Sequence, residues 1–215
     1  MELLLVRHGE TKANSHHIYQ PPTESISAPG AAEVARLVRT IQEFKPTHLY
    51  TSHYTRARET AHFLEYATEL QATWLEEVSE LRVADYMYGK SHYGLHSMFY
   101  LLRWYFNLLP EDITDQIETK KEFSNRVFQA RDYFAQNHAG DRVVVVSHSI
   151  FTNFFIAHLC QDNGVNIFKA APLLMKILLH ENSSVSHIRY IGETEKNVCP
   201  WEVVSFNAHR HLENI

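Results

Sequence analysis

The sequence predicts an α/β fold, with a mostly parallel central sheet covered by helices on both faces in three layers, α/β/α. Apolar runs at Leu3–Val6 and Val143–Val146 have the composition of strands that are buried on both faces. The chain between them contains segments with the 3.6-residue apolar period of helices. Strands that alternate with helices form parallel sheets with right-handed crossovers, so we expect this layered arrangement.

Helices and strands alternate along the chain in an order that fits this fold. The segment Gly30–Phe44 carries apolar residues at helical spacing, and Pro46 follows its end. The remaining expected elements are, in chain order, a strand at His48–Tyr50, a helix at Thr55–Ala67 capped by Ser52 or Thr55, a strand at Thr73–Leu75, a helix at Lys120–Asn137 and a strand at Arg142–Val146.

Composition restricts the class of protein and its partners. A chain of 215 residues with 45% hydrophobic residues can bury one substantial core, which predicts a single domain over residues 1–215. The formal net charge of −5 gives no general attraction to nucleic acid or to an anionic membrane. No apolar run approaches the roughly 20 residues of a membrane span. The apolar run at the N-terminus ends at Arg7, which makes it too short for the apolar region of a signal sequence. We therefore expect a soluble, cytoplasmic protein.

The cysteines and histidines indicate neither a disulfide framework nor a metal centre. Cys160 and Cys199 are too few for a framework; we interpret both as free thiols, although a single bridge between them stays open. The chain has 15 histidines, but none shows zinc-ligand spacing with a cysteine or glutamate partner. We expect no metal and no cofactor.

Polar groups follow three of the expected strands, at the point where each strand ends. Since ligands of open α/β sheets bind at the carboxyl ends of the strands, these groups are expected to converge on one pocket. The paired donors of an arginine guanidinium and the N–H groups of a helix N-terminus match the oxygens of a phosphoryl group. The predicted ligand is therefore a phosphate ester. The groups are Arg7-His8-Gly9, Ser52 with Arg56, and Ser147-His148-Ser149.

These motifs resemble those of the histidine phosphatase superfamily, the phosphoglycerate-mutase-like proteins, on its phosphatase branch. The opening Leu-Val-Arg-His-Gly-Glu-Thr is similar to the family signature, and further matches extend over nearly the whole chain. The matching positions are Arg7 to Thr11, Asn14, Gln20, Gly30, Ser52, Arg56-Ala57, Thr60-Ala61, Glu80, Gly89, Glu118, Arg126, Asn182 to Ser186, Trp201, Asn207 and His211-Leu212.

The resemblance implies a role for each candidate residue. His8 is the expected nucleophile, which attacks phosphorus as a neutral imidazole and forms a phosphohistidine. Glu80 is the expected general acid and base, with Asp85 as the alternative. The expected phosphate-binding residues are Arg7, Arg56 and a cationic His148, supported by Asn14, Gln20 and Ser149.

Two features depart from the family pattern. Ser149-Ile150 stands where the family usually has two glycines, which predicts a less permissive turn after His148. Residues 90–117 form an insertion-like stretch with an apolar, aromatic segment at 95–109. That segment is interpreted either as a helix packed on the core or as a lid over the phosphate pocket, and a lid favours substrates with an apolar or aromatic portion.

Hydrolysis of a small phosphorylated substrate is the activity that the sequence favours. Phosphoglycerate mutases typically carry an additional basic set, and this chain offers only the scattered Arg103, Lys120 and Lys121 in the corresponding region. A mutase-type phosphotransferase and a non-catalytic phosphate-binding scaffold remain alternatives, and assembly as a homodimer stays open.

Overall fold

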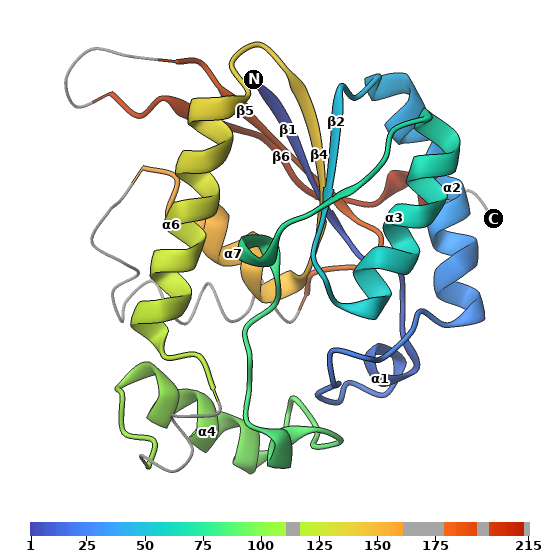
Figure 1. The fold of residues 1–215 in the computed structure, drawn as a ribbon. Helices are drawn as coiled ribbons and strands as arrows, with labels where there is room; N and C mark the ends of the chain where they lie inside the picture. Colours follow the sequence, from blue (N-terminus) through green and yellow to red (C-terminus); the bar gives the residue numbers. More distant parts are fainter. Residues whose placement is uncertain (111–116, 161–178, 193–197, 213–215) are drawn as a thin grey trace.

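A six-stranded sheet in the order β3-β2-β4-β1-β5-β6 organises the protein (Figure 1). The computed structural model describes residues 1–110, 117–160, 179–192 and 198–212. Strands β1 to β4 run parallel and only β5 runs against its neighbours, which confirms the predicted α/β class with a mostly parallel sheet. The strands are β1 (Glu2–Arg7), β2 (His48–Thr51), β3 (Thr73–Trp74), β4 (Arg142–Ser147), β5 (Val185–Tyr190) and β6 (Trp201–Ala208).

Helices cover both faces of this sheet. In Figure 1, α6 and α7 lie on one face, α2 and α3 lie on the other, and α4 lies beyond the strand ends. None of the helices in the described ranges is long and apolar enough to span a bilayer. Their bounds are α1 (Lys12–Ser15), α2 (Ala28–Phe44), α3 (Thr55–Thr68), α4 (Leu95–Tyr105), α6 (Lys120–Asn137) and α7 (Ser149–Ala157), with short 3-10 turns at Glu76–Val78, Asp85–Met87 and Arg210–Leu212.

The alternation of side chains along the central strands creates two cores. Successive strand residues point to opposite faces, so Leu3 and Leu5 of β1 belong to one core and Leu4 and Val6 to the other. The first core includes large aromatic residues of α6 and α7, and the second includes aliphatic residues of α2 and α3. Uninterrupted apolar runs are therefore needed in β1 and β4, because both faces of these strands are buried.

Two glycines allow the loop after β1 to pack closely against the start of α2. A Cβ atom on Gly30 would lie 2.1 Å from the carbonyl oxygen of Glu10, and one on Gly9 would lie 2.8 Å from the carbonyl oxygen of Gly30. Neither position has room for a side chain. This contact fixes the path of the chain immediately after His8.

The observed elements begin and end within two residues of the predicted bounds, and the largest difference is at the start of α2. The Lys120–Asn137 helix is confirmed with both bounds, whereas α2 begins at Ala28 because the Ser27 side chain caps it by accepting from the Gly30 backbone N–H. The predicted cap of α3 is wrong. Tyr54 occupies the cap position and makes no side-chain cap hydrogen bond, because its side chain has no short polar group. Ser52 lies two residues earlier, where its hydroxyl accepts from the Tyr54 backbone N–H and contacts His148 Nε2.

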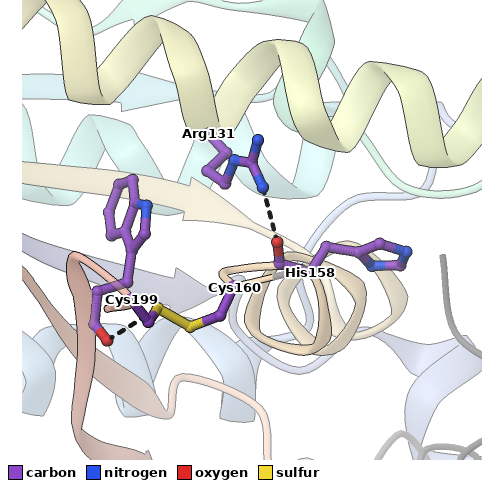
Figure 2. Close-up of a disulfide and its surroundings, with 5 residues drawn as sticks. Arg131, His158, Cys160 and Cys199 are labelled. Carbon is purple, nitrogen blue, oxygen red and sulfur yellow. Dashed lines mark hydrogen bonds between the residues drawn. A yellow bond between two sulfur atoms is a disulfide. The ribbon is translucent and has the colours of Figure 1, made fainter. Parts of the chain in front are cut away.

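A disulfide joins Cys160, just past the end of α7, to Cys199, just before β6 (Figure 2). The interpretation of both cysteines as free thiols is therefore wrong. Their Cα atoms lie 5.3 Å apart, a spacing that disulfides require and that the sequence separation of 39 residues does not reveal. Nearby, the Arg131 guanidinium donates to the His158 carbonyl oxygen at 2.9 Å, which ties α6 to the same end of α7.

Candidate active site

Three strands deliver polar residues to one edge of the sheet, as the sequence predicts. His8 follows β1, Ser52 follows β2 and His148 follows β4, and all three side chains are buried. The imidazole rings of His8 and His148 lie 5.1 Å apart between centroids. The Ser52 hydroxyl lies 2.8 Å from His148 Nε2. Residues far apart in the chain thus form one cluster at the carboxyl end of the sheet.

His8 is held in the tautomer that a nucleophile needs. Its Nδ1 lies 2.8 Å from the Gly9 carbonyl oxygen, which can only accept, so we assign the ring proton to Nδ1. Nε2 then carries the lone pair and accepts from Arg56 Nε at 3.1 Å. Burial, together with the charges of Arg56 and Arg7, holds the pKa of His8 well below its ordinary value. The ring is therefore neutral over the physiological pH range.

His148 lies beneath the site and is completely buried. Its Nδ1 has no hydrogen-bond partner among the described residues, but His148 is not itself among the residues that line the cavity. Burial and the charge of Arg56 lower the pKa of His148 well below its ordinary value, so the ring is neutral in this structure and differs from the expected cation. A dianion beside Nδ1 would favour the protonated form and raise that pKa again.

Two arginines supply the positive charge of the site. Arg56 is buried and donates to His8 and, through Nη1, to the Pro21 carbonyl oxygen at 3.1 Å. Arg7 donates through Nη1 to the His180 carbonyl oxygen, and its Nε is buried without a partner in the described ranges. Burial lowers the pKa of both guanidinium groups to about 10, and both remain charged at neutral pH. Their donors can bind an anion beside His8.

Glu80 shares a cavity with His8, Arg7 and Arg56, and Glu181 lines the same cavity. Its two oxygens accept from the backbone N–H groups of Ile150 and Phe151 at 3.1 and 3.0 Å, at the start of α7. These bonds favour the ionised form, but burial outweighs them and raises the pKa of Glu80 above its ordinary value. A raised pKa suits a group that must both donate and accept a proton.

The alternative acid, Asp85, occupies a different environment. It begins the short 3-10 turn Asp85–Met87, it is exposed, and it is not among the residues that line the cavity. The geometry therefore favours Glu80 for the acid role.

An arginine on α6 positions the backbone of Glu80. Arg126 pairs with Glu118 through two contacts of 2.6 Å and donates to the carbonyl oxygens of Glu77 and Ser79 at 2.9 and 2.7 Å. A third donor reaches the Glu80 carbonyl oxygen at 3.3 Å. The sequence matches Glu118 and Arg126 to the family pattern but gives them no role. In the structure they hold the loop that carries Glu80.

The three predicted supporting residues line the same cavity. Gln20 accepts from the Thr11 hydroxyl at 2.6 Å, and Asn14 forms a reciprocal capping box with Thr11 at the start of α1. Ser149 begins α7 directly after His148, which is extended with φ −135°. Neither Ser149 nor Ile150 adopts a positive φ, so the turn does not need the two glycines that the family usually has there.

His180 is a site residue that the sequence did not indicate. Its carbonyl oxygen accepts from Arg7, and its Nδ1 accepts from the Asn153 amide at 3.0 Å. Burial and the charge of Arg7 lower its pKa to about 3, so the ring is neutral. His180 lies in no recognisable motif, and only the fold brings it beside Arg7.

The candidate site opens into a cavity of about 700 Å³ whose opposite wall is apolar. Helix α4, inside the predicted insertion at 90–117, provides much of this wall. The segment 95–109 packs partly on the core and partly along the cavity, and its role as a lid stays a prediction. Tyr100 and Trp104 are buried in the core, while Met98 and Leu102 line the cavity and are about half exposed. Residues 111–116 of the insertion lie outside the described ranges.

The chain belongs to the histidine phosphatase superfamily, branch 1, whose sequence model matches residues 3–199. It is thus a member of an enzyme superfamily in which both phosphatases and mutases occur. No curated protein matches the sequence.

Solved structures with this fold include phosphatases and a mutase. Phosphoserine phosphatase from Entamoeba histolytica, in complex with phosphoserine, is 20% identical, with a TM-score of 0.74 and 98% coverage of both chains. YhfR from Bacillus stearothermophilus is 23% identical, with a TM-score of 0.73 and 98% coverage of both chains. Phosphoglycerate mutase from Bacillus anthracis is 20% identical, with a TM-score of 0.73 and coverage of 99% of this chain and 95% of the mutase. At these identities the likeness concerns the fold.

Proposed function

We propose that this protein is a phosphomonoester hydrolase that acts through a phosphohistidine on His8. One observation carries the proposal: His8 is buried and neutral, its Nε2 accepts from Arg56, and it lines a cavity that also contains Arg7 and a carboxyl group with a raised pKa. A neutral nucleophile, fixed cations and an acid of suitable pKa are the components that phosphoryl transfer through a covalent intermediate requires.

In the first step, the lone pair of His8 Nε2 attacks phosphorus and the bond from phosphorus to the ester oxygen breaks. Glu80 gives its proton to the departing oxygen, so the product leaves as a neutral alcohol. The Gly9 carbonyl oxygen retains its hydrogen bond to Nδ1–H and stabilises the positive charge that develops on the ring. Arg7 and Arg56 bind the phosphoryl oxygens while charge moves onto them.

In the second step, water attacks the phosphohistidine. The Glu80 carboxylate takes a proton from this water, the bond from phosphorus to Nε2 breaks, and phosphate leaves. His8 returns to its neutral form and Glu80 is again protonated. These steps use side chains of this chain alone and account for the expectation that neither a metal nor a cofactor takes part.

Charge in the cavity supports hydrolysis over mutase activity. A mutase must hold a second anionic group of its substrate, which calls for additional cations near the site. Among the described residues that line the cavity, Arg7 and Arg56 are the only arginines and there is no lysine. Lys120, one of the scattered basic residues, lies over the Tyr105 ring at 3.7 Å and does not line the cavity.

The decisive experiment is turnover of p-nitrophenyl phosphate in buffer treated with a chelator, at mildly acidic and neutral pH. The proposal expects phosphate release by the wild-type protein and a phosphorylated His8 in the rapidly quenched enzyme, identified by mass spectrometry. Absence of turnover would favour the other two readings. Interconversion of phosphoglycerates with catalytic 2,3-bisphosphoglycerate would then identify a mutase, and no activity in either assay would identify a scaffold.

The proposed partner is a small phosphorylated substrate, and the apolar wall of the cavity favours one with an apolar or aromatic portion. Light scattering on the purified protein would show whether it assembles as a homodimer. Cytoplasmic location also stays a prediction, and the Cys160–Cys199 disulfide is a feature more typical of oxidising compartments. Fractionation of producing cells would decide between the two.

A further inference from the structure

A second cluster of histidine and carboxylate side chains lies at the opposite edge of the sheet from His8. His48 is the first residue of β2, Asp141 directly precedes β4, and His138 follows the last residue of α6. Strands β2 and β4 begin at this edge and end beside the candidate active site. The cluster therefore has no part in the phosphoryl transfer proposed above.

The three side chains direct their ligand atoms toward one another. Asp141 Oδ2 lies 2.9 Å from His138 Nδ1 and 3.4 Å from His48 Nδ1, and one ligand atom from each residue fits within a span of 4.8 Å. A zinc ion about 2.0–2.2 Å from each ligand needs ligand atoms about 3–4 Å apart. Both distances to Asp141 meet this requirement. The three ligand atoms span up to 4.8 Å, slightly more than this range. His48 is half exposed, so a small rotation of its ring can bring its nitrogen closer to the other two ligand atoms.

A buried tyrosine fixes the orientation of His138. His138 Nε2 lies 2.9 Å from the Tyr50 hydroxyl, which in turn lies 3.1 Å from the Tyr133 hydroxyl. Without an ion, Nδ1–H donates to Asp141 Oδ2 and Nε2 accepts from the Tyr50 hydroxyl. An ion at Nδ1 requires the other tautomer, in which Nε2–H donates to Tyr50 and the Nδ1 lone pair binds the ion. Metal-binding histidines characteristically have their second nitrogen held by a hydrogen bond of this kind. His138 is buried, so its orientation is set before any ion binds.

We propose that His48, His138 and Asp141 bind a divalent transition-metal ion of the zinc type. Two imidazoles and one carboxylate form a donor set that zinc and cobalt accept, with water in the remaining position on the exposed side. The neighbouring cation does not compete for the carboxylate, because Arg142 directs its Nε to the Lys45 carbonyl oxygen at 2.6 Å. An ion here would connect the end of α6 to the starts of β2 and β4 and stabilise that edge of the sheet.

The test is titration of the metal-free protein with Co²⁺, followed by visible absorption, and with Zn²⁺, followed by calorimetry. Inorganic phosphate is omitted, and His8→Ala is titrated in parallel to count any ion held by the active-site histidines. The proposal expects one equivalent of ion that His8→Ala retains. It expects affinity to fall at least about 10-fold in His48→Ala and in Asp141→Asn.

His62→Ala is the matched control, because His62 also faces a carboxylate, Glu65 at 3.3 Å, but the part of the chain that the structure describes offers it no third ligand. Its affinity for the ion is expected to equal that of the wild type. Both substituted positions of the cluster are at the surface, and thermal unfolding in chelator checks that the variants fold. Unchanged affinity in His48→Ala and Asp141→Asn, or no saturable binding below about 1 mM, overturns the proposal.

Discussion

The two ends of the active-site cavity are built in different ways. The polar end lies where the strands end, and its groups are buried and have defined hydrogen-bond partners. His8 is bonded to Gly9 and Arg56, and Glu80 accepts from two backbone N–H groups at the start of α7. At the α4 wall, Met98 and Leu102 line the cavity through apolar contact and are about half exposed. The polar end fixes the positions of the reacting groups, whereas the α4 wall offers an apolar surface that a substrate can contact.

This difference separates the chemistry from the selection of substrate. Hydrogen bonds to buried groups hold reacting atoms in place, and losing one such partner costs far more than losing a partly exposed apolar contact. Substitutions at the polar end should therefore act on kcat, and substitutions on α4 should act on KM. The following predictions test that division.

The largest effect is expected for His8→Ala. Without the imidazole no phosphohistidine forms, and kcat for p-nitrophenyl phosphate should fall by more than about 10⁴-fold. Steady-state assay of both proteins measures this, with the thermal unfolding midpoint as evidence of folding. Activity within tenfold of the wild type would contradict the covalent mechanism.

Glu80→Gln should have the next largest effect, lowering kcat by about 10²- to 10⁴-fold for an alkyl phosphate, whose leaving oxygen needs a proton. The loss should be smaller for p-nitrophenyl phosphate, because its leaving group is a weak base. Asp85→Asn is the matched control and should keep kcat within about twofold of the wild type, since Asp85 does not line the cavity. Equal losses in the two variants would remove the acid role from Glu80.

The pH profile should separate the two titrating groups of the polar end. His8 must be unprotonated, and its lowered pKa keeps it so on the acid side of neutrality. Glu80 must be protonated for the first step, and its raised pKa keeps it so to higher pH than an ordinary glutamic acid. The value of kcat/KM should therefore fall as pH rises through the pKa of Glu80, at a higher pH than an ordinary glutamic acid would give. Persistence of this fall in Glu80→Gln would assign it to another group.

Leu102→Asn should give a smaller effect confined to binding. It should raise KM for naphthyl phosphate by about 3- to 10-fold and leave KM for glycerol phosphate nearly unchanged, because only the aromatic ester reaches the α4 wall. Phe99→Asn is the matched control, since Phe99 lies on the same helix and is similarly exposed but does not line the cavity. A kcat loss in Leu102→Asn larger than its KM change would break the division between the two ends.

Reduction of the Cys160–Cys199 disulfide should affect activity least. It removes a covalent constraint and should lower the free energy of unfolding by about 2–4 kcal/mol, while kcat stays within about twofold. Denaturant unfolding with and without reductant measures the first value, and the same samples give the second under non-denaturing conditions. A large loss of kcat would mean that the bridge also holds the start of α7 against Glu80.

The sequence anticipated the elements whose pattern is local. Leu3–Val6 and Val143–Val146 indicated β1 and β4 because buried strands need apolar residues on both faces, and the apolar face of Lys120–Asn137 indicated α6 with both bounds. The cap of α3 was wrong because the cap position falls on Tyr54, between the two predicted residues, and the Ser52 hydroxyl bonds the Tyr54 N–H instead of a helical one. The free thiols were wrong because the approach of Cys160 to Cys199 depends on how β6 lies against the end of α7.

The sequence by itself determined which residues stand at the ends of the strands, because hydrophobic period and strand length are properties of neighbouring residues. Only the tertiary structure decided their chemical state. His8 and His148 are neutral because residues from other elements bury them and surround them with arginine charge. Glu80 rather than Asp85 shares the cavity with His8, and the N–H donors at the start of α7 hold its carboxylate there. Protonation depends on desolvation and on charges close in space, and folding sets both.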